Sequence, residues 1–165
     1  MIRRLFVEKK SGYDTVRRRK QKEIENAFSV TLEDMRMLLR YDIQGMDDED
    51  YARAERTIFS EPPVDNVYEE NVDLAGYTVI GVELLPGQYD QRGDSAEQCV
   101  QLLTQGERCK VLTARVIALK GNITDEELVK VEEYLINPVE SRLASLEKPK
   151  TLDMEIPVPE NVKRV

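Results

Sequence analysis

The chain of 165 residues contains no histidine and no tryptophan, and only two cysteines. The lack of histidine excludes Ser-His and Cys-His catalysis and removes the commonest general base and the commonest metal ligand. Cys99 and Cys109 have neither zinc-ligand spacing nor a disulfide-rich context, which is typical of a reducing compartment. A Walker-type phosphate loop is also missing. We therefore expect no catalytic residue, no metal site and no cofactor in this chain.

Long apolar runs are missing too, since none approaches the ~18 residues that a membrane span requires. Met1–Arg4 leads into a strand pattern and not into a signal peptide. The net charge of −8 opposes binding to nucleic acid, because most non-specific affinity for nucleic acid comes from attraction to phosphate. A composition of 41% hydrophobic and 34% charged residues is typical of a globular protein with its own core. We expect a cytoplasmic protein without membrane or nucleic-acid partners.

Strand and helix patterns alternate along the chain. Arg3–Glu8 is predicted to be a strand, and the apolar residues of Met35–Ile43 fall on every second position, which indicates a half-buried strand. Asp14, Asp47 and Thr124 are predicted to cap helices, and Thr124 has capping-box spacing with the glutamate three residues later. The acids that follow Asp47 and Thr124 favour a helix start, so capping explains them without catalysis.

Apolar positions recur at a fixed offset, which suggests an internal duplication. Three residues of one predicted helix recur 77 residues later: Tyr51, Ala54 and Ile58 correspond to Leu128, Val131 and Leu135. Each half is expected to form strand, helix, strand, helix and a short last strand, near Asn66–Glu70 or Ser141–Leu146. We predict an α+β fold of two duplicated two-layer halves, residues 1–70 and 77–147, with mainly antiparallel sheets and a pseudo-twofold arrangement. Residues 148–165 are expected to be an extended linker towards a missing domain.

The most informative stretch is Pro86–Cys99. The apolar run Val79–Leu85 before it fits a strand covered on both faces, and Pro86 must end that strand because proline fixes φ and lacks an amide donor. Gly87 and Gly93 can take the positive φ values that a tight loop needs.

A helix is predicted to begin after this loop, at Asp94 or Ser95. Ser95 and Gln98 have capping-box spacing. Ala96, Cys99, Val100 and Leu103 recur at the spacing of one buried helix face. We therefore interpret Cys99 as a core residue and not as a nucleophile.

An aromatic ring, an acid, amides and a guanidinium occur together in the loop itself: Gln88, Tyr89, Asp90, Gln91 and Arg92. This is more recognition chemistry than a turn needs, and such groups on a loop are typical of a contact with another domain. A merely structural loop is the alternative. For Arg17–Lys20, a solvated helix face and an anion-binding patch are likewise both open.

Three segments of the chain resemble the amino-terminal region of the large, single-chain phosphoribosylformylglycinamidine synthases: Leu85–Cys99, Phe59–Tyr68 and Leu135–Arg142. The resemblance spans about residues 1–155. In that family this region is similar to a fused dimer of the small structural subunit that other organisms make separately. It is not the catalytic domain.

The resemblance implies a part of a ligase of de novo purine biosynthesis, which uses ATP and glutamine to amidate formylglycinamide ribonucleotide. The synthetase domain, with ATP and magnesium, and the glutaminase domain would be other parts of that enzyme. This chain alone would be inactive, would dock the synthetase and glutaminase domains, and would assist ammonia transfer between them. The sequence also leaves open a free-standing regulatory domain that binds a small molecule between its halves.

Overall fold

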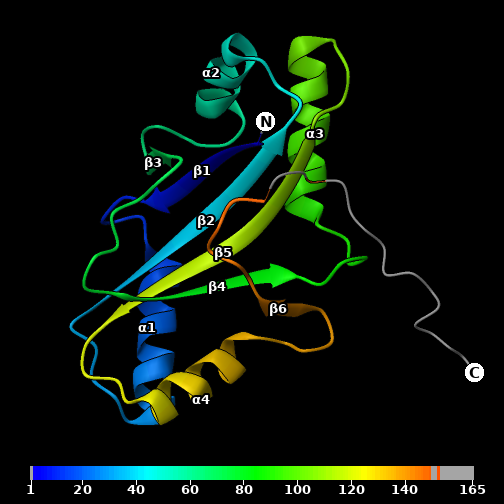
Figure 1. Ribbon diagram of the computed structural model, residues 1–165. Helices are drawn as coiled ribbons and strands as arrows, with labels where there is room; N and C mark the ends of the chain where they lie inside the picture. The colour runs from blue at the N-terminus through cyan, green and yellow to red at the C-terminus, as the bar shows by residue number, and fades with distance from the viewer. Residues whose placement is uncertain (1, 150–151, 153–165) are drawn as a thin grey trace, which may run out of the picture.

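A computed structural model describes residues 2–149 and 152 of the chain. In this part the chain forms one antiparallel sheet of six strands and four helices (Figure 1). The strands are β1 (Ile2–Lys9), β2 (Asp34–Gln44), β3 (Asp65–Glu69), β4 (Thr78–Leu84), β5 (Lys110–Lys120) and β6 (Ser141–Leu143). The helices are α1 (Thr15–Phe28), α2 (Asp48–Thr57), α3 (Gln91–Thr104) and α4 (Asp125–Leu135). The predicted α+β class and antiparallel pairing are confirmed.

The sheet has the strand order β3-β1-β2-β5-β4-β6. The first three strands of the chain therefore lie side by side and meet the last three through β2 and β5. The pairing of these two central strands extends from Asp34 opposite Lys120 to Gln44 opposite Lys110. The predicted halves, residues 1–70 and 77–147, thus contribute to one continuous sheet.

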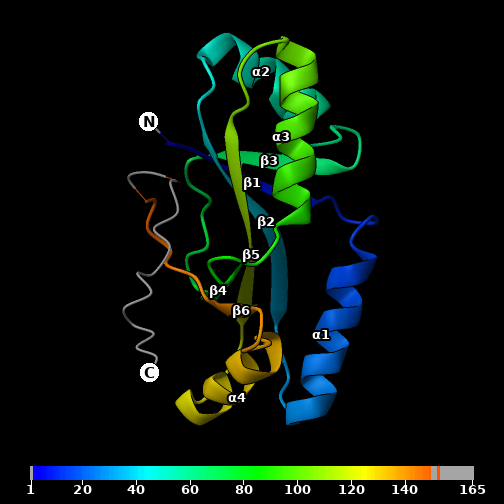
Figure 2. The same cartoon turned by 90° about the vertical axis from the view of Figure 1, so that its right-hand side faces the viewer.

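All four helices pack on one face of this sheet, in two pairs at opposite ends (Figures 1 and 2). Helices α2 and α3 cover a core cluster that includes Leu5, Tyr41 and Ile43. Helices α1 and α4 cover a second cluster that includes Met35 and Ile117. The apolar positions of β2 alternate as predicted, because successive strand residues point to opposite faces and only one face meets the helices.

Two connections cover the opposite face of the sheet (Figure 2). The segment between β3 and β4 covers a small cluster of Phe6, Leu38 and Val116. The segment after β6 crosses two buried arginines: Arg4 Nη1 donates to Leu146 O at 2.9 Å, and Arg40 Nη1 donates to Ser145 O at 2.9 Å. Arg4 also forms a paired contact with Asp42, at 2.7 and 2.9 Å. The chain therefore turns back over its own sheet before residue 150.

Local sequence signals account for two of the helix starts. Asp47 accepts a hydrogen bond from Asp50 N at 2.8 Å, and Thr124 and Glu127 form the predicted capping box, with distances of 3.2 and 3.0 Å. Asp14 precedes α1 as predicted but makes no capping bond, because its carboxylate binds the guanidinium of Arg17 at 2.8 Å.

The end of the chain differs in part from the prediction. Strand β6 ends at Leu143 and not at Leu146. Ala144 N still donates to Gly81 O of β4 at 2.8 Å, and from Ser145 onward the chain crosses the sheet. Most of the predicted linker, residues 148–165, lies outside the described residues. Leu152, which is described, is 4% exposed, and its N–H donates to Gln44 Oε1 at 2.7 Å.

Candidate functional site

The predicted interface loop Gln88–Arg92 follows β4 through a tight turn. Gln88 N donates to Leu85 O at 3.0 Å, and Gly87 has a φ of +91°. Proline followed by a residue with positive φ is the signature of a type II turn, which explains why Pro86 and Gly87 stand together. The predicted positive φ of Gly87 is confirmed. After this turn the chain leaves the sheet and enters the exposed loop.

Helix α3 begins at Gln91, and Asp90 caps it. The predicted start, at Asp94 or Ser95, was wrong. Asp90 Oδ1 accepts from Gly93 N at 2.8 Å, and its Oδ2 accepts from Thr113 N on β5 at 2.8 Å. One carboxylate thus caps the helix and joins it to the neighbouring strand. Ser95 lies inside the helix, so its predicted capping box with the glutamine three residues later does not form.

Gly93 was predicted to take a positive φ, but it does not. Its role is to allow close packing. It lies in the first turn of α3, where a Cβ atom would meet the backbone carbonyl oxygen of Val111 at 2.5 Å. Glycine is therefore required because the helix approaches β5 too closely for any side chain.

Exposed side chains surround this fixed helix start. Tyr89 is 69% exposed, and its hydroxyl donates to Asp94 Oδ2 at 2.7 Å, a hydrogen bond that raises the pKa of the tyrosine. Gln88, Gln91 and Arg92 are exposed as well. Of the five predicted interface residues, Asp90 therefore has a structural role, and the others are open to solvent.

The two cysteines differ from each other. Cys99 is exposed, so its assignment to the core was wrong. Ala96 and Val100 form the buried face of α3, and Cys99 lies beside that face, where β5 does not cover the helix. Cys109 is buried, and burial raises the pKa of its thiol to about 11.

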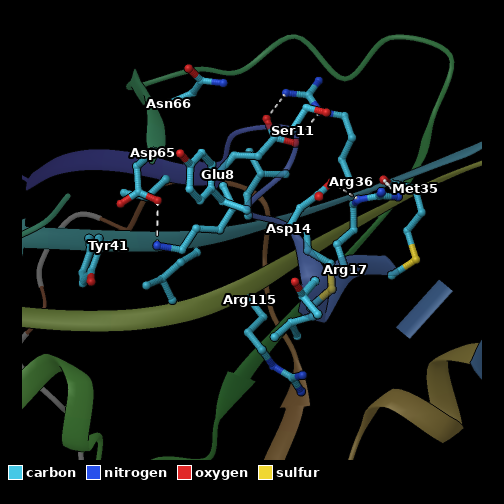
Figure 3. A pocket seen from close by; sticks show the side chains of 18 of the residues that line it. Glu8, Ser11, Asp14, Arg17, Met35, Arg36, Tyr41, Asp65, Asn66 and Arg115 are labelled. Carbon is cyan, nitrogen blue, oxygen red and sulfur yellow. Dashed lines mark hydrogen bonds and ion pairs between the residues drawn. The ribbon is translucent and has the colours of Figure 1, made fainter. Parts of the chain in front are cut away.

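A groove of about 720 Å³ lies on the helix-covered face of the sheet, between the start of α1 and the start of α3 (Figure 3). Met37 and Leu39 of β2 form part of its floor, at the point where the two core clusters meet. Tyr13 and Val16 line the side of α1 and are more than half exposed. The groove exists because the two helix pairs cover the ends of the sheet and leave the centre open.

Most charges along the groove are paired. Two ion pairs line it: Lys9 with Asp65 at 2.9 Å, and Asp14 with Arg17 at 2.8 Å. Among the described residues, Arg92 and Arg115 have no carboxylate partner within 4.0 Å. Arg115 donates to Leu135 O at 3.4 Å. Burial raises the pKa of the Tyr41 hydroxyl, and the adjacent Arg92 guanidinium opposes this rise. The groove thus offers an apolar floor and two arginines.

Apart from Arg92, which belongs to the predicted interface loop, and Arg17 of the basic run, sequence reasoning did not identify the groove residues. Arg115 could have been noticed, because it is the one charge within the apolar run Val111–Leu119. Arg17, from the basic run at Arg17–Lys20, lies at the groove, but it is bound to Asp14 and Gln21.

Within residues 2–149 and 152, no group of three or more histidine, cysteine, aspartate or glutamate side chains is arranged to hold a metal ion. No helix in the same residues is long and apolar enough to cross a membrane. Comparison of the chain with models of known protein families and with curated protein sequences finds no match.

Proposed function

We propose that this chain is the non-catalytic amino-terminal assembly domain of a phosphoribosylformylglycinamidine synthase. In this role it docks the synthetase and glutaminase parts of that ligase in the cytoplasm and assists ammonia transfer between them. ATP and magnesium belong to the synthetase part, and the chain by itself carries out no step of the amidation. The proposal takes its identity from the resemblance of Leu85–Cys99, Phe59–Tyr68 and Leu135–Arg142 to that family.

One structural observation carries the docking role. The loop Gln88–Arg92 is held in place by contacts with β5, while four of its five side chains are exposed to solvent. Asp90 joins the loop to Thr113 of β5, and Gly93 allows α3 to lie directly against that strand. Tyr89 and Arg92 are thereby presented at the surface in a fixed arrangement. Rigid presentation reduces the entropy lost on association, so it favours a contact surface.

The proposed duplication is supported by the arrangement of the two halves. Each half has the order strand, helix, strand, helix, strand, and α1 and α3 both contain 14 residues. The strand order β3-β1-β2-β5-β4-β6 has corresponding strands at equal distances from the centre. We propose that the halves are related by a pseudo-twofold axis between β2 and β5, as in a fused dimer.

The groove favours a second candidate function, a regulatory domain that binds a small molecule between its halves. Its volume of about 720 Å³ lies within the range of roughly 300–1,000 Å³ seen for ligand pockets. It is lined by residues of both halves, including Leu39 and Arg115. A ligand for this site would combine an apolar body with a carboxylate or phosphate group.

Reconstitution of the ligase with Arg92→Ala tests the docking proposal. We expect the glutamine-dependent rate to fall by about fivefold or more, the scale of an interface residue worth ~1 kcal/mol. The rate with free ammonia should fall less, because a docking defect disturbs transfer between sites and leaves the synthetase chemistry intact. Arg18→Ala, an exposed charge on α1, is the control and should change neither rate. Equal losses with both nitrogen sources would place Arg92 at the synthetase site instead.

Thermal unfolding with a panel of carboxylate and phosphate metabolites tests the second candidate. A ligand at about 100 times its Kd stabilises the folded state by ~2.7 kcal/mol. Stabilisation that Arg115→Ala removes would favour the regulatory domain.

A further inference from the structure

The outer face of α3 is almost free of charge. Its solvent-exposed residues within the helix are Gln91, Arg92, Ser95, Gln98, Cys99, Gln101 and Leu102. Arg92, in the first turn, is the only charged member of this set, in a chain with 34% charged residues. The helix also contains the acids Asp94 and Glu97, which lie along one edge of this set and are both paired with the guanidinium of Arg108. Asp94 also accepts a hydrogen bond from Gln98 at 2.9 Å, so the charges at this edge are neutralised by contacts within the chain. Leu102, at the centre of the uncharged part, is 79% exposed.

The other helices do not share this property. The exposed side of α1 carries Arg18, Arg19 and Lys22, and that of α4 carries Asp125, Glu126, Lys130 and Glu133. A helix face that is meant for solvent usually carries charges, whereas the centre of a protein interface is depleted of them. The outer face of α3 therefore has the composition of an interface.

We propose that the α3 face, defined as Gln91, Ser95, Gln98, Cys99, Gln101 and Leu102, docks an uncharged, amide-rich and apolar surface of a partner polypeptide. The inference rests on the proposed function, since the partner is the polypeptide that carries the synthetase or the glutaminase. Arg92 is not part of this face, because its guanidinium lies beside the Tyr41 hydroxyl at the groove. The face continues into Gln88 and Tyr89, which precede the helix and are also exposed.

Size and charge favour this partner over a second copy of the chain. A helix of 14 residues is ~21 Å long at about 1.5 Å per residue, so one face buries a few hundred Å². A stable dimer of free copies needs about 800 Å² on each side. Each copy also brings a net charge of −8, which opposes self-association. A partner that is held near the chain by further contacts needs no such area, because its effective concentration is high.

Leu102→Glu tests the face, because it places a charge at its centre without touching the core. The variant and the unmodified chain are each titrated with the polypeptide that carries the synthetase and the glutaminase. We expect binding to weaken by about tenfold or more, as for a central interface residue. Val129→Glu, at a residue of α4 that is 51% exposed, is the matched control and should change the Kd by less than about twofold. Circular dichroism melts establish that both variants fold.

Cys99 supplies an independent readout on the unmodified chain. In the free chain, Ellman's reagent should modify Cys99 and leave the buried Cys109 unmodified. In the complex, the rate of modification of Cys99 should fall by about tenfold or more if the α3 face is covered.

Failure of the unmodified chain to bind overturns the proposed function and this inference together. Binding that Leu102→Glu does not weaken, with Cys99 still reactive, overturns the α3 face alone. Sedimentation as a dimer that Leu102→Glu dissociates would show that the occupant is a second copy and would overturn the proposed partner.

Discussion

Glu55 of α2 and Glu69 of β3 form a carboxyl pair at one end of the sheet. Burial, the hydrogen bond to Glu69 and the charge of Glu69 together raise the pKa of Glu55 to about 7. The Tyr51 hydroxyl close by is buried and has no hydrogen-bond partner among the described residues. Burial also raises the pKa of Tyr51, so its hydroxyl stays neutral and does not relieve the pair. The pair is therefore favourable only while it holds a proton.

The stability of the protein should depend on pH through this pair. The folded-state pKa of Glu55, about 7, lies above its ordinary value of 4.5, so between these values the folded state binds a proton that the unfolded state does not. The contribution of the pair is fully present below about pH 4.5 and is lost as the pH rises through 7. Glu55→Gln keeps a hydrogen-bond donor at every pH, so it should remove this loss. Melting temperatures from pH 5 to 8 measure it.

Glu133→Gln, at an exposed residue of α4, is the control and should keep the pH dependence of the unmodified chain. A Glu55→Gln variant whose melting temperature falls across this range as steeply as that of the unmodified chain would contradict the assignment.

At the scale of elements, the contact between α3 and β5 determines the geometry of the candidate site. Asp90 links the start of the helix to Thr113, and Gly93 lets the helix lie against the carbonyl of Val111. The helix is thereby fixed by its first turn, and Ala96 and Val100 continue the contact into the core. The exposed loop and the outer face of α3 owe their positions to these few contacts.

Gly93→Ala should destabilise the protein by about 1–3 kcal/mol, the usual cost of forcing an extra methyl group into a filled space. The atom that it would meet at 2.5 Å is a backbone oxygen of β5, which cannot rotate away as a side chain could. Urea unfolding measures the change. Gly106→Ala is the control, because the nearest atom there is a threonine hydroxyl at 3.5 Å, and we expect a change within about 0.5 kcal/mol. Equal stabilities of the two variants would show that α3 can move off the strand at little cost.

At the scale of the whole molecule, the two halves are joined at the middle of the sheet by β2 and β5. The pairing of β2 with β5 joins them along the full length of both strands. Each core cluster draws residues from both halves: Leu5 packs in the same cluster as Val100, and Ile24 in the same cluster as Val131. Because each cluster is completed only by residues of the other half, the halves should fold as one cooperative unit.

Core truncations in the two clusters should therefore shift one common transition. Leu5→Ala and Ile117→Ala remove side chains that are fully buried in different clusters, and each should cost about 2–5 kcal/mol. Unfolding curves from far-UV circular dichroism and from tyrosine fluorescence should coincide for both variants. Separate transitions for the two probes would mean that the clusters unfold independently.

Several features of this protein follow from the sequence by itself because they depend on neighbours a few residues apart. Asp47 and Thr124 cap helices through bonds to residues three positions later. The turn at Pro86 and Gly87 follows from the φ values that these two residues favour. The alternation of Met35–Ile43 indicated β2 and its buried face, since that pattern only requires that one side of the strand be covered.

Other features were decided by the tertiary structure, because they depend on residues far apart in the chain. Asp90 caps α3 through a local bond to Gly93 N, but the same carboxylate also binds Thr113, 23 residues away, and no local pattern contains that second partner. Cys99 is exposed because β5 covers Ala96 and Val100 and leaves the adjacent side of the helix open. The groove beside Arg115 exists because the strand order places the two helix pairs at opposite ends of one sheet. The sequence thus determined the order of the elements and the caps of α2 and α4, and long-range pairing decided which side chains are buried and which are exposed.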